Sequence, residues 1–302
     1  MEKTIGFHLP GILKSYPVIL ALDYIMKENP ECFREGAYIA SVYGTYPTSV
    51  WNGGRFVQGL TDEKTIRMTL EKFNGMGIPV RFTYTNPLIT EEHLDDRFCN
   101  RTLQIADNGM NEVIINSPIL EDYIRKNYPN FKITSSTCKQ IENADDLNRE
   151  LDKDYNLVVL DYNLNRDFEF LKSIKKKEKC ELLADACCIP HCPRRGQHYR
   201  DIGQAHIDYW KNQQEHRGKL PEFQEYDCEY RSNTIYDTVG YETRIMPDEV
   251  YSTYVPMGFN QFKLEGRYSN NAFLIDKVAQ YMVKPEFRDQ VRLDILCYVY
   301  RD

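Results

Sequence analysis

The sequence lacks any apolar run that approaches the roughly 20 residues needed to cross a lipid bilayer. Its first residues, Met1-Glu-Lys-Thr4, also lack the features of a secretory signal, because no basic segment precedes a long apolar run. The apolar run over 16–26 is short and carries Asp23. These absences predict a cytoplasmic protein without a membrane span. In the reducing cytosol, clustered cysteines indicate a metal site or catalysis more often than disulfide bonds.

The chain also lacks an excess of positive charge. Lys and Arg number 38 against 45 Asp and Glu, which gives a net charge of −7 over 302 residues. This balance argues against general nucleic-acid binding, because such surfaces neutralise phosphates with clustered Lys and Arg. A local basic site stays open, since Arg194, Arg195 and Arg200 lie close together.

Several motifs of common enzyme classes are absent. No G-x-G-x-x-G follows the first predicted strand, and neither H-E-x-x-H nor G-x-S-x-G occurs. The sequence therefore gives little support to dinucleotide binding, to a zinc peptidase or to a serine hydrolase. A cysteine nucleophile would need a nearby histidine, and His191 or His198 could serve only if the cysteines hold no metal.

What the chain does contain is an alternation of short β-rich runs and amphipathic segments. Strands are predicted over 4–8, 37–43, 79–84, 112–116, 132–136, 157–161, 181–185 and 261–265, and helices over 12–27, 62–75, 91–107, 118–128, 144–153 and 167–177. Eight strands with intervening helices favour an α/β fold, a TIM-like (β/α)8 barrel, over an open doubly wound sheet. We expect one domain over 1–302, with 186–250 as a cysteine-containing loop and insertion over the barrel mouth and 270–302 as a C-terminal helical extension.

Polar side chains gather where the predicted strands end, which in a barrel is the end that carries the active site. The candidates for catalysis are His8, Asn86, Asn116 and Asp161, and those for binding a small-molecule or carrier-bound substrate are Arg55, Arg194, Glu265 and Arg267. Arginine binds carboxylate or phosphate groups through paired hydrogen bonds. The alternative is that these side chains only meet solvent at the strand ends or form surface or structural salt bridges.

The densest group of unusual residues is a set of cysteines. Four of the nine cysteines fall within thirteen residues, at 180, 187, 188 and 192, and Cys228 follows. Thiolates are the preferred ligands of soft metals and iron–sulfur clusters. Cys188-x3-Cys192 can converge on one centre, and Cys180 and Cys228 could complete a set of four. We favour Cys188 over Cys187 because of this spacing. Structural zinc is an alternative, and simple burial of the thiols is another.

These motifs together resemble the peptidase U32 family of collagenase-like proteins. The resemblance is carried by Cys180-Glu-Leu182, the Cys188-x3-Cys192 pair, Cys228 and Phe262-Lys-Leu-Glu-Gly-Arg267, with partial echoes at Asn52-Gly-Gly-Arg55 and at 133–137. It implies a TIM-like barrel with a 4Fe–4S cluster held by Cys180, Cys188, Cys192 and Cys228. The His and Gly of the usual family loop are absent here. The loop is closer to a divergent branch with a C-I-P-x-C-P core followed by His198-Tyr199.

The resemblance implies more than one activity. Some relatives are peptidases, and others are similar to oxygen-independent hydroxylases of ubiquinone precursors or ribosomal RNA, with prephenate as the suspected oxygen donor. The main prediction is an iron–sulfur redox enzyme that hydroxylates or otherwise modifies its substrate without oxygen. The alternatives are a U32-type peptidase and a non-catalytic, cluster-bearing partner of a second barrel protein in a heterodimer.

Overall fold

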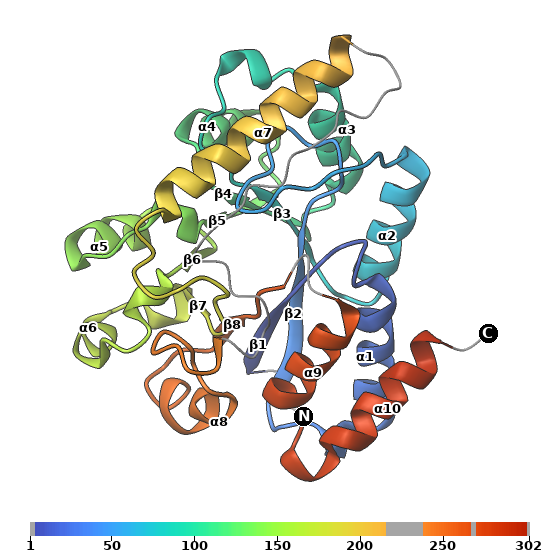
Figure 1. The fold of residues 1–302 in the computed structure, drawn as a ribbon, viewed down its shortest axis with the longest axis vertical. Helices are drawn as coiled ribbons and strands as arrows, with labels where there is room; N and C mark the ends of the chain where they lie inside the picture. The colour runs from blue at the N-terminus through green and yellow to red at the C-terminus, as the bar shows by residue number, and fades with distance from the viewer. Residues whose placement is uncertain (1–3, 216–237, 267–269, 301–302) are drawn as a thin grey trace.

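The computed structural model describes residues 4–215, 238–266 and 270–300, and within them the chain forms a closed barrel of parallel strands (Figure 1). The strands are β1 (Ile5–Pro10), β2 (Ala37–Gly44), β3 (Val80–Tyr84), β4 (Glu112–Ile115), β5 (Lys132–Ser135), β6 (Leu157–Val159), β7 (Cys180–Leu183) and β8 (Gln261–Lys263). Each strand pairs with the next, and β8 closes on β1. The predicted (β/α)8 barrel is confirmed.

Helices surround the barrel. They are α1 (Tyr16–Glu28), α2 (Glu63–Gly75), α3 (Arg97–Ala106), α4 (Pro118–Asn127), α5 (Ala144–Asp152), α6 (Phe168–Ser173), α7 (Arg195–Glu215), α8 (Pro247–Glu249), α9 (Asn271–Met282) and α10 (Arg288–Val299). The predicted helix over 91–107 is shorter in the structure, because the Asp96 side chain accepts a hydrogen bond from the Cys99 amide and caps α3. None of the helices in the described ranges is long and apolar enough to span a membrane.

The hydrophobic core lies between the outer faces of the strands and the helices. Phe7 and Phe262 on the neighbouring strands β1 and β8 are fully buried, with ring centroids 5.9 Å apart. Because side chains alternate along a strand, the next residues, His8 and Lys263, face the barrel interior. This interior is polar, whereas branched apolar side chains fill most barrels of this class.

The long helix α7 is fastened to the carboxyl end of the barrel. Asn86, after β3, donates from Nδ2 to the carbonyl of Gly203 in α7 at 3.1 Å, and Trp210 donates to Asp96 at 2.9 Å. A Cβ at Gly203 would lie 2.4 Å from Asn86 Oδ1, so this close approach requires glycine. The stretch predicted as a loop and insertion therefore contains a 21-residue helix.

Candidate functional site

A cavity of about 80 Å³ lies at the carboxyl end of the barrel strands. Its lining includes the charged side chains of Arg55, Arg195, Lys263 and Glu265, the thiols of Cys138 and Cys188, and the rings of Tyr43, Tyr162, His198 and Tyr199. These residues come from the ends of different strands, as expected for the active end of a barrel. The cavity is therefore the candidate site.

One wall of the cavity is built around Glu265, which follows β8. Its carboxylate forms an ion pair with Arg55 and accepts a hydrogen bond from the Cys187 amide at 2.7 Å. Its own amide donates to Asp185 at 2.6 Å, and Asp185 is 2.5 Å from Nζ of the buried Lys277. These contacts join the ends of β7 and β8 to α9, so the start of the cysteine loop is held in place.

A second part of the lining is organised by Arg195, the first residue of α7. Its guanidinium donates to Asp161 at 2.5 Å and to the Tyr199 hydroxyl at 2.9 Å, and it lies 4.2 Å from the centroid of the Tyr162 ring. Burial raises the pKa of Asp161, although the charge of Arg195 opposes this shift. The predicted Arg194 is instead 41% exposed and lies 3.9 Å from Asp201. The cavity lining thus includes Arg195, the neighbour of the predicted Arg194, as well as the predicted Arg55.

The cysteine loop brings two thiols together. His191 has a left-handed backbone with φ of 50°, and its amide donates to Asn163 at 2.9 Å, which bends the chain between Cys188 and Cys192. The pKa of Cys188 is raised to about 11 by burial and by the neighbouring Cys192 thiol. Cys187 has a different environment, since its thiol points to the carbonyl of Asp185 at 3.9 Å. Cys188 lines the cavity, and its predicted role as a metal ligand stays a prediction.

The structure does not bring Cys180 to this pair. Cys180 is the first residue of β7 and belongs to the hydrophobic core, with its thiol 3.5 Å from the Lys176 carbonyl. It therefore lies at the amino end of its strand, while Cys188 lies beyond the carboxyl end. Cys228 is outside the described residues. A cubane needs four thiolates. The described ranges contain no group of three or more His, Cys, Asp or Glu side chains that could hold a metal ion, and the predicted four-thiolate set, which includes Cys228, stays a prediction.

The predicted catalytic residues separate into different environments. Asn86 is fully buried, and its amide holds the carbonyls of Val50 and Gly203, so it positions α7. Asn116 is half-buried after β4 and is not part of the cavity lining. Asp161 acts through its ion pair with Arg195. Of the predicted binding residues, Arg55 and Glu265 line the cavity, and Arg267 is outside the described residues.

His8 lies inside the barrel within a buried polar cluster. Its Nδ1 is 2.7 Å from Ser41 Oγ and 2.8 Å from Arg81, and Arg81 donates to Glu181 at 2.6 Å. Burial lowers the pKa of His8 to about 3, with Glu181 opposing the shift and Arg81 adding to it. His8 is therefore neutral at physiological pH and is not part of the cavity lining.

The lining residues that were not predicted as site residues include Cys138, Arg195 and Lys263. Lys263 could have been found, because it precedes Glu265 by two residues and side chains two apart on a strand share a face. Cys138 follows β5 in a 3₁₀ turn over Thr137–Lys139, whose fold the sequence does not signal.

Comparisons with known proteins show what the chain is similar to. No family model matches the chain. Over 118 residues, which are 36% of this chain, it is 25% identical to an uncharacterised protease of Methanocaldococcus jannaschii. That alignment spans only 35% of the relative's length. The solved structure of a U32 peptidase matches with a TM-score of 0.50 at 13% identity and covers 88% of this chain and 94% of its own. The resemblance to U32 proteins is thus confirmed at the level of the fold.

Proposed function

We propose that this chain is a peptidase-like hydrolase of the U32 type, with Cys188 as the nucleophile and His198 as its base. The observation that carries the proposal is that both side chains line the same cavity at the carboxyl end of the barrel. The fold likeness to a U32 peptidase and the partial likeness to a protease support it. His191, the other histidine considered, is exposed and is not part of the lining.

The protonation states fit a base-assisted attack. Cys188, whose pKa is about 11, is a thiol at neutral pH and needs a base to become nucleophilic. Burial and the charge of Arg55 lower the pKa of His198, which keeps its imidazole neutral and able to take a proton. In the proposed reaction the sulfur attacks the peptide carbonyl and His198 transfers the thiol proton to the leaving amine. Water then hydrolyses the thioester and releases the acid.

The test is hydrolysis of a fluorogenic peptide library by the purified protein. Cys188→Ser and His198→Gln should each abolish cleavage, while Cys297→Ser, at an exposed site on α10, should leave it unchanged. Cys138→Ser decides between the two thiols of the cavity. Full activity of Cys188→Ser, or loss of activity on adding a metal chelator, would contradict a thiol hydrolase.

The iron–sulfur redox enzyme is the second candidate, and the neighbouring thiols of Cys188 and Cys192 favour it. Its other two ligands would have to come from residues such as Cys228, outside the described ranges. Anaerobic purification followed by iron and sulfide analysis tests this candidate. A 4Fe–4S cluster would give about four irons per chain, lost in Cys188→Ser and Cys192→Ser but not in Cys32→Ser. Zinc without sulfide would indicate a zinc site. Iron and sulfide without activity would favour the non-catalytic partner.

A further inference from the structure

Attack of a thiol on a peptide bond places negative charge on the carbonyl oxygen of the substrate. A hydrogen-bond donor that is already aimed at this oxygen stabilises the charge, and such stabilisation is usually the largest single contribution to catalysis. Two backbone amides of the cysteine loop are not available for it, because the Cys187 amide donates to Glu265 at 2.7 Å and the His191 amide donates to Asn163 at 2.9 Å. The side chains of the cavity lining are the other source of a donor.

The two arginines of the lining differ in what their guanidinium groups already bind. Arg195 is paired with Asp161, its side chain is 5% exposed, and all three of its guanidinium nitrogens already donate. Arg55 donates from Nη1 to the carbonyl of Gly54 at 2.9 Å and from Nη2 to Glu265, and its guanidinium makes no further hydrogen bond among the described residues. Its side chain is 31% exposed. Because a guanidinium carries five N–H groups, Arg55 keeps donors for a ligand.

Glu265 brings Arg55 to the cysteine loop. One oxygen of its carboxylate is paired with Arg55, and the other accepts the hydrogen bond from the Cys187 amide. One carboxylate therefore holds both the guanidinium and the backbone just before Cys188. Glu265 is the main cause that raises the pKa of Arg55, and Cys188 adds to the same shift, which fits a guanidinium beside this thiol. Arg55, Cys188 and His198 line the same cavity.

The loop after β2 that carries Arg55 is fixed against the barrel. The Gly53 amide donates to the carbonyl of Thr83 at 3.3 Å, and a Cβ at Gly53 would lie 2.4 Å from the backbone of Thr85, so this close approach requires glycine. The buried Asn52 side chain donates to the Arg55 carbonyl at 2.7 Å. A donor that is fixed before the substrate arrives needs no reorganisation during the reaction.

We propose that Arg55 binds the carbonyl oxygen of the scissile peptide bond and stabilises the negative charge that forms there. The inference rests on the proposed hydrolase and adds a further catalytic residue to it. When the Cys188 sulfur bonds to the carbonyl carbon, one electron pair of the C=O double bond moves to the oxygen and the thiol proton moves to His198. When the intermediate collapses, this pair re-forms the double bond, the C–N bond breaks and His198 gives the proton to the leaving amine. Arg55 donates hydrogen bonds to the oxygen and neither gains nor loses a proton.

The kinetics of the library peptide that is cleaved best give the first test. Arg55→Gln should lower kcat about 100-fold and change KM little, because a donor that acts on the transition state affects kcat. Arg55→Lys keeps the charge and should recover part of the rate. Arg101→Gln on α3 is the matched control and should cleave like the wild type, because Arg101 also pairs with a glutamate, Glu63, but lies on the surface. A folded Arg55→Gln protein that keeps its kcat would reject the proposal.

Addition of an aldehyde tests the same contact without peptide cleavage. The Cys188 sulfur bonds to the aldehyde carbon of N-acetylglycinal, the thiol proton passes to the aldehyde oxygen, and the adduct resembles the tetrahedral intermediate. Carbon-13 NMR with the labelled aldehyde should show the adduct in the wild type and not in Cys188→Ser, and Arg55→Gln should weaken its formation at least about ten-fold. A crystal structure of the wild-type adduct should place its oxygen within hydrogen-bond distance of an Arg55 nitrogen. This measurement does not require any variant to fold.

An adduct oxygen that lies away from Arg55, or a wild-type protein that forms no adduct, would overturn the proposal. Failure of the hydrolase itself is distinguishable. A protein that forms the adduct against Arg55 but cleaves no peptide keeps Arg55 as the group that binds a carbonyl oxygen and loses the hydrolase. Peptide cleavage that needs Cys188 and His198 but not Arg55 keeps the hydrolase and rejects Arg55 as the donor.

Discussion

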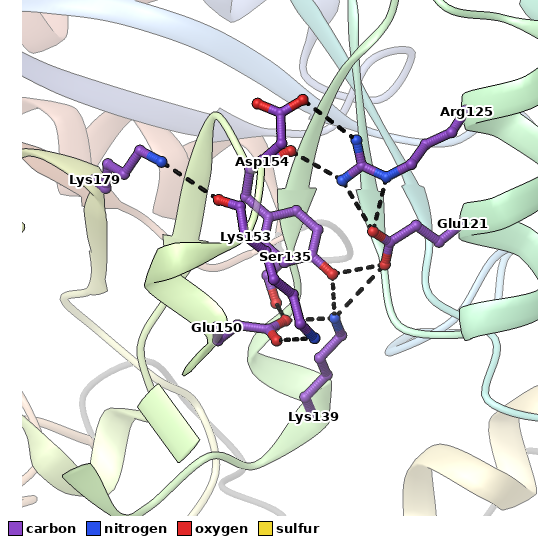
Figure 2. Close-up of polar contacts among 9 residues, drawn as sticks. Glu121, Arg125, Ser135, Lys139, Glu150, Lys153, Asp154 and Lys179 are labelled. Atoms are coloured by element: carbon purple, nitrogen blue, oxygen red, sulfur yellow. Dashed lines mark hydrogen bonds and ion pairs between the residues drawn. The ribbon is translucent and has the colours of Figure 1, made fainter. Parts of the chain in front are cut away.

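The molecule contains two networks of charged side chains, an outer one and an inner one. Both are held by ion pairs and hydrogen bonds, but they lie in different parts of the fold. The outer network lies between α4, β5 and α5 (Figure 2), where Glu150 accepts hydrogen bonds from Lys139 at 2.5 Å, from Lys153 at 2.7 Å and from Ser135. The Tyr155 hydroxyl extends it, donating to Glu121 at 2.6 Å and accepting from Lys139 at 3.0 Å. Both carboxylate oxygens of Glu150 therefore accept hydrogen bonds.

The inner network fills the barrel below the cavity and is less complete. Arg81 is fully buried between Glu112 and Glu181, yet its Nε and Nη2 make no hydrogen bond within the part of the chain that the structure describes. Glu181 Oε1 has none there either and faces Lys263 at 3.6 Å.

The contrast separates stability from function. Both oxygens of Glu150 accept hydrogen bonds, whereas the inner pairs leave buried polar atoms without one among the described residues, and such buried ion pairs are costly to desolvate and often replaceable by apolar side chains. The inner network also stands where barrels usually carry apolar layers. Local rules of folding are broken mainly at functional sites, so we interpret the inner network as support for the cavity, whose lining includes Lys263.

The largest expected effect comes from breaking the inner network. Glu181→Gln should lower the free energy of unfolding by about 3–5 kcal/mol, because the charge of Arg81 stays buried without its closest carboxylate. Urea denaturation measures this loss. The double variant Arg81→Met, Glu181→Leu removes both charges of this pair and should recover part of the stability, because Glu112 then loses its contact with Arg81. A Glu181→Gln protein as stable as the wild type would contradict the contrast.

As the pH falls, the inner network should lose stability at a higher pH than the outer network does. The pKa of His8 is lowered from 6.5 to about 3 in the folded protein, so below pH 6.5 the unfolded chain binds the proton and the folded chain does not. Stability is therefore complete above pH 6.5 and falls as the pH decreases towards 3, with a loss of about 2 kcal/mol between pH 7 and 5. Urea denaturation at both values should show that His8→Gln loses less than the wild type. Parallel losses in the two proteins would contradict the assignment.

The sequence predicts the barrel well because its signals are local. The strand runs, and the rule that the strands' carboxyl ends form the site, were enough to select Arg55 and Glu265. Cys180 shows where spacing fails. A strand rises about 3.3 Å per residue, so a cysteine that begins a strand is carried away from one that follows it. It also points outward, because Glu181, its neighbour, points inward.

Which arginine side chain is buried depends on tertiary contacts that no local sequence pattern reveals. Arg194 and Arg195 are equivalent in the sequence, and only the start of α7 at Arg195 buries that side chain against Asp161 and Tyr162. Asn86 was predicted to be catalytic because it follows a strand, but its amide binds the carbonyl of Gly203 in α7, and it is not part of the cavity lining. Docking of α7 decides both cases, and it depends on residues far apart in the chain.

The smallest effect is expected in the outer network. Burial alone would raise the pKa of Glu150, but hydrogen bonds from Lys139, Lys153 and Ser135 outweigh it and lower the pKa from 4.5 to about 2. Glu150→Gln should cost about 1–2 kcal/mol at pH 7, less than the lowered pKa alone implies, because Lys153 is 56% exposed and can turn to water while Lys139 keeps its bond to Tyr155.

The pH dependence of this small loss identifies its origin. A carboxylate with a lowered pKa contributes its full stability above pH 4.5 and loses it as the pH falls towards 2. The difference in unfolding free energy between the wild type and Glu150→Gln should therefore stay constant from pH 7 to 5, where His8→Gln diverges from the wild type, and shrink between pH 4.5 and 3. Paired urea titrations at these values measure it. If the difference in unfolding free energy between the wild type and Glu150→Gln already shrinks between pH 7 and 5, the two networks titrate together. The distinction between the outer network and the inner network would then be wrong.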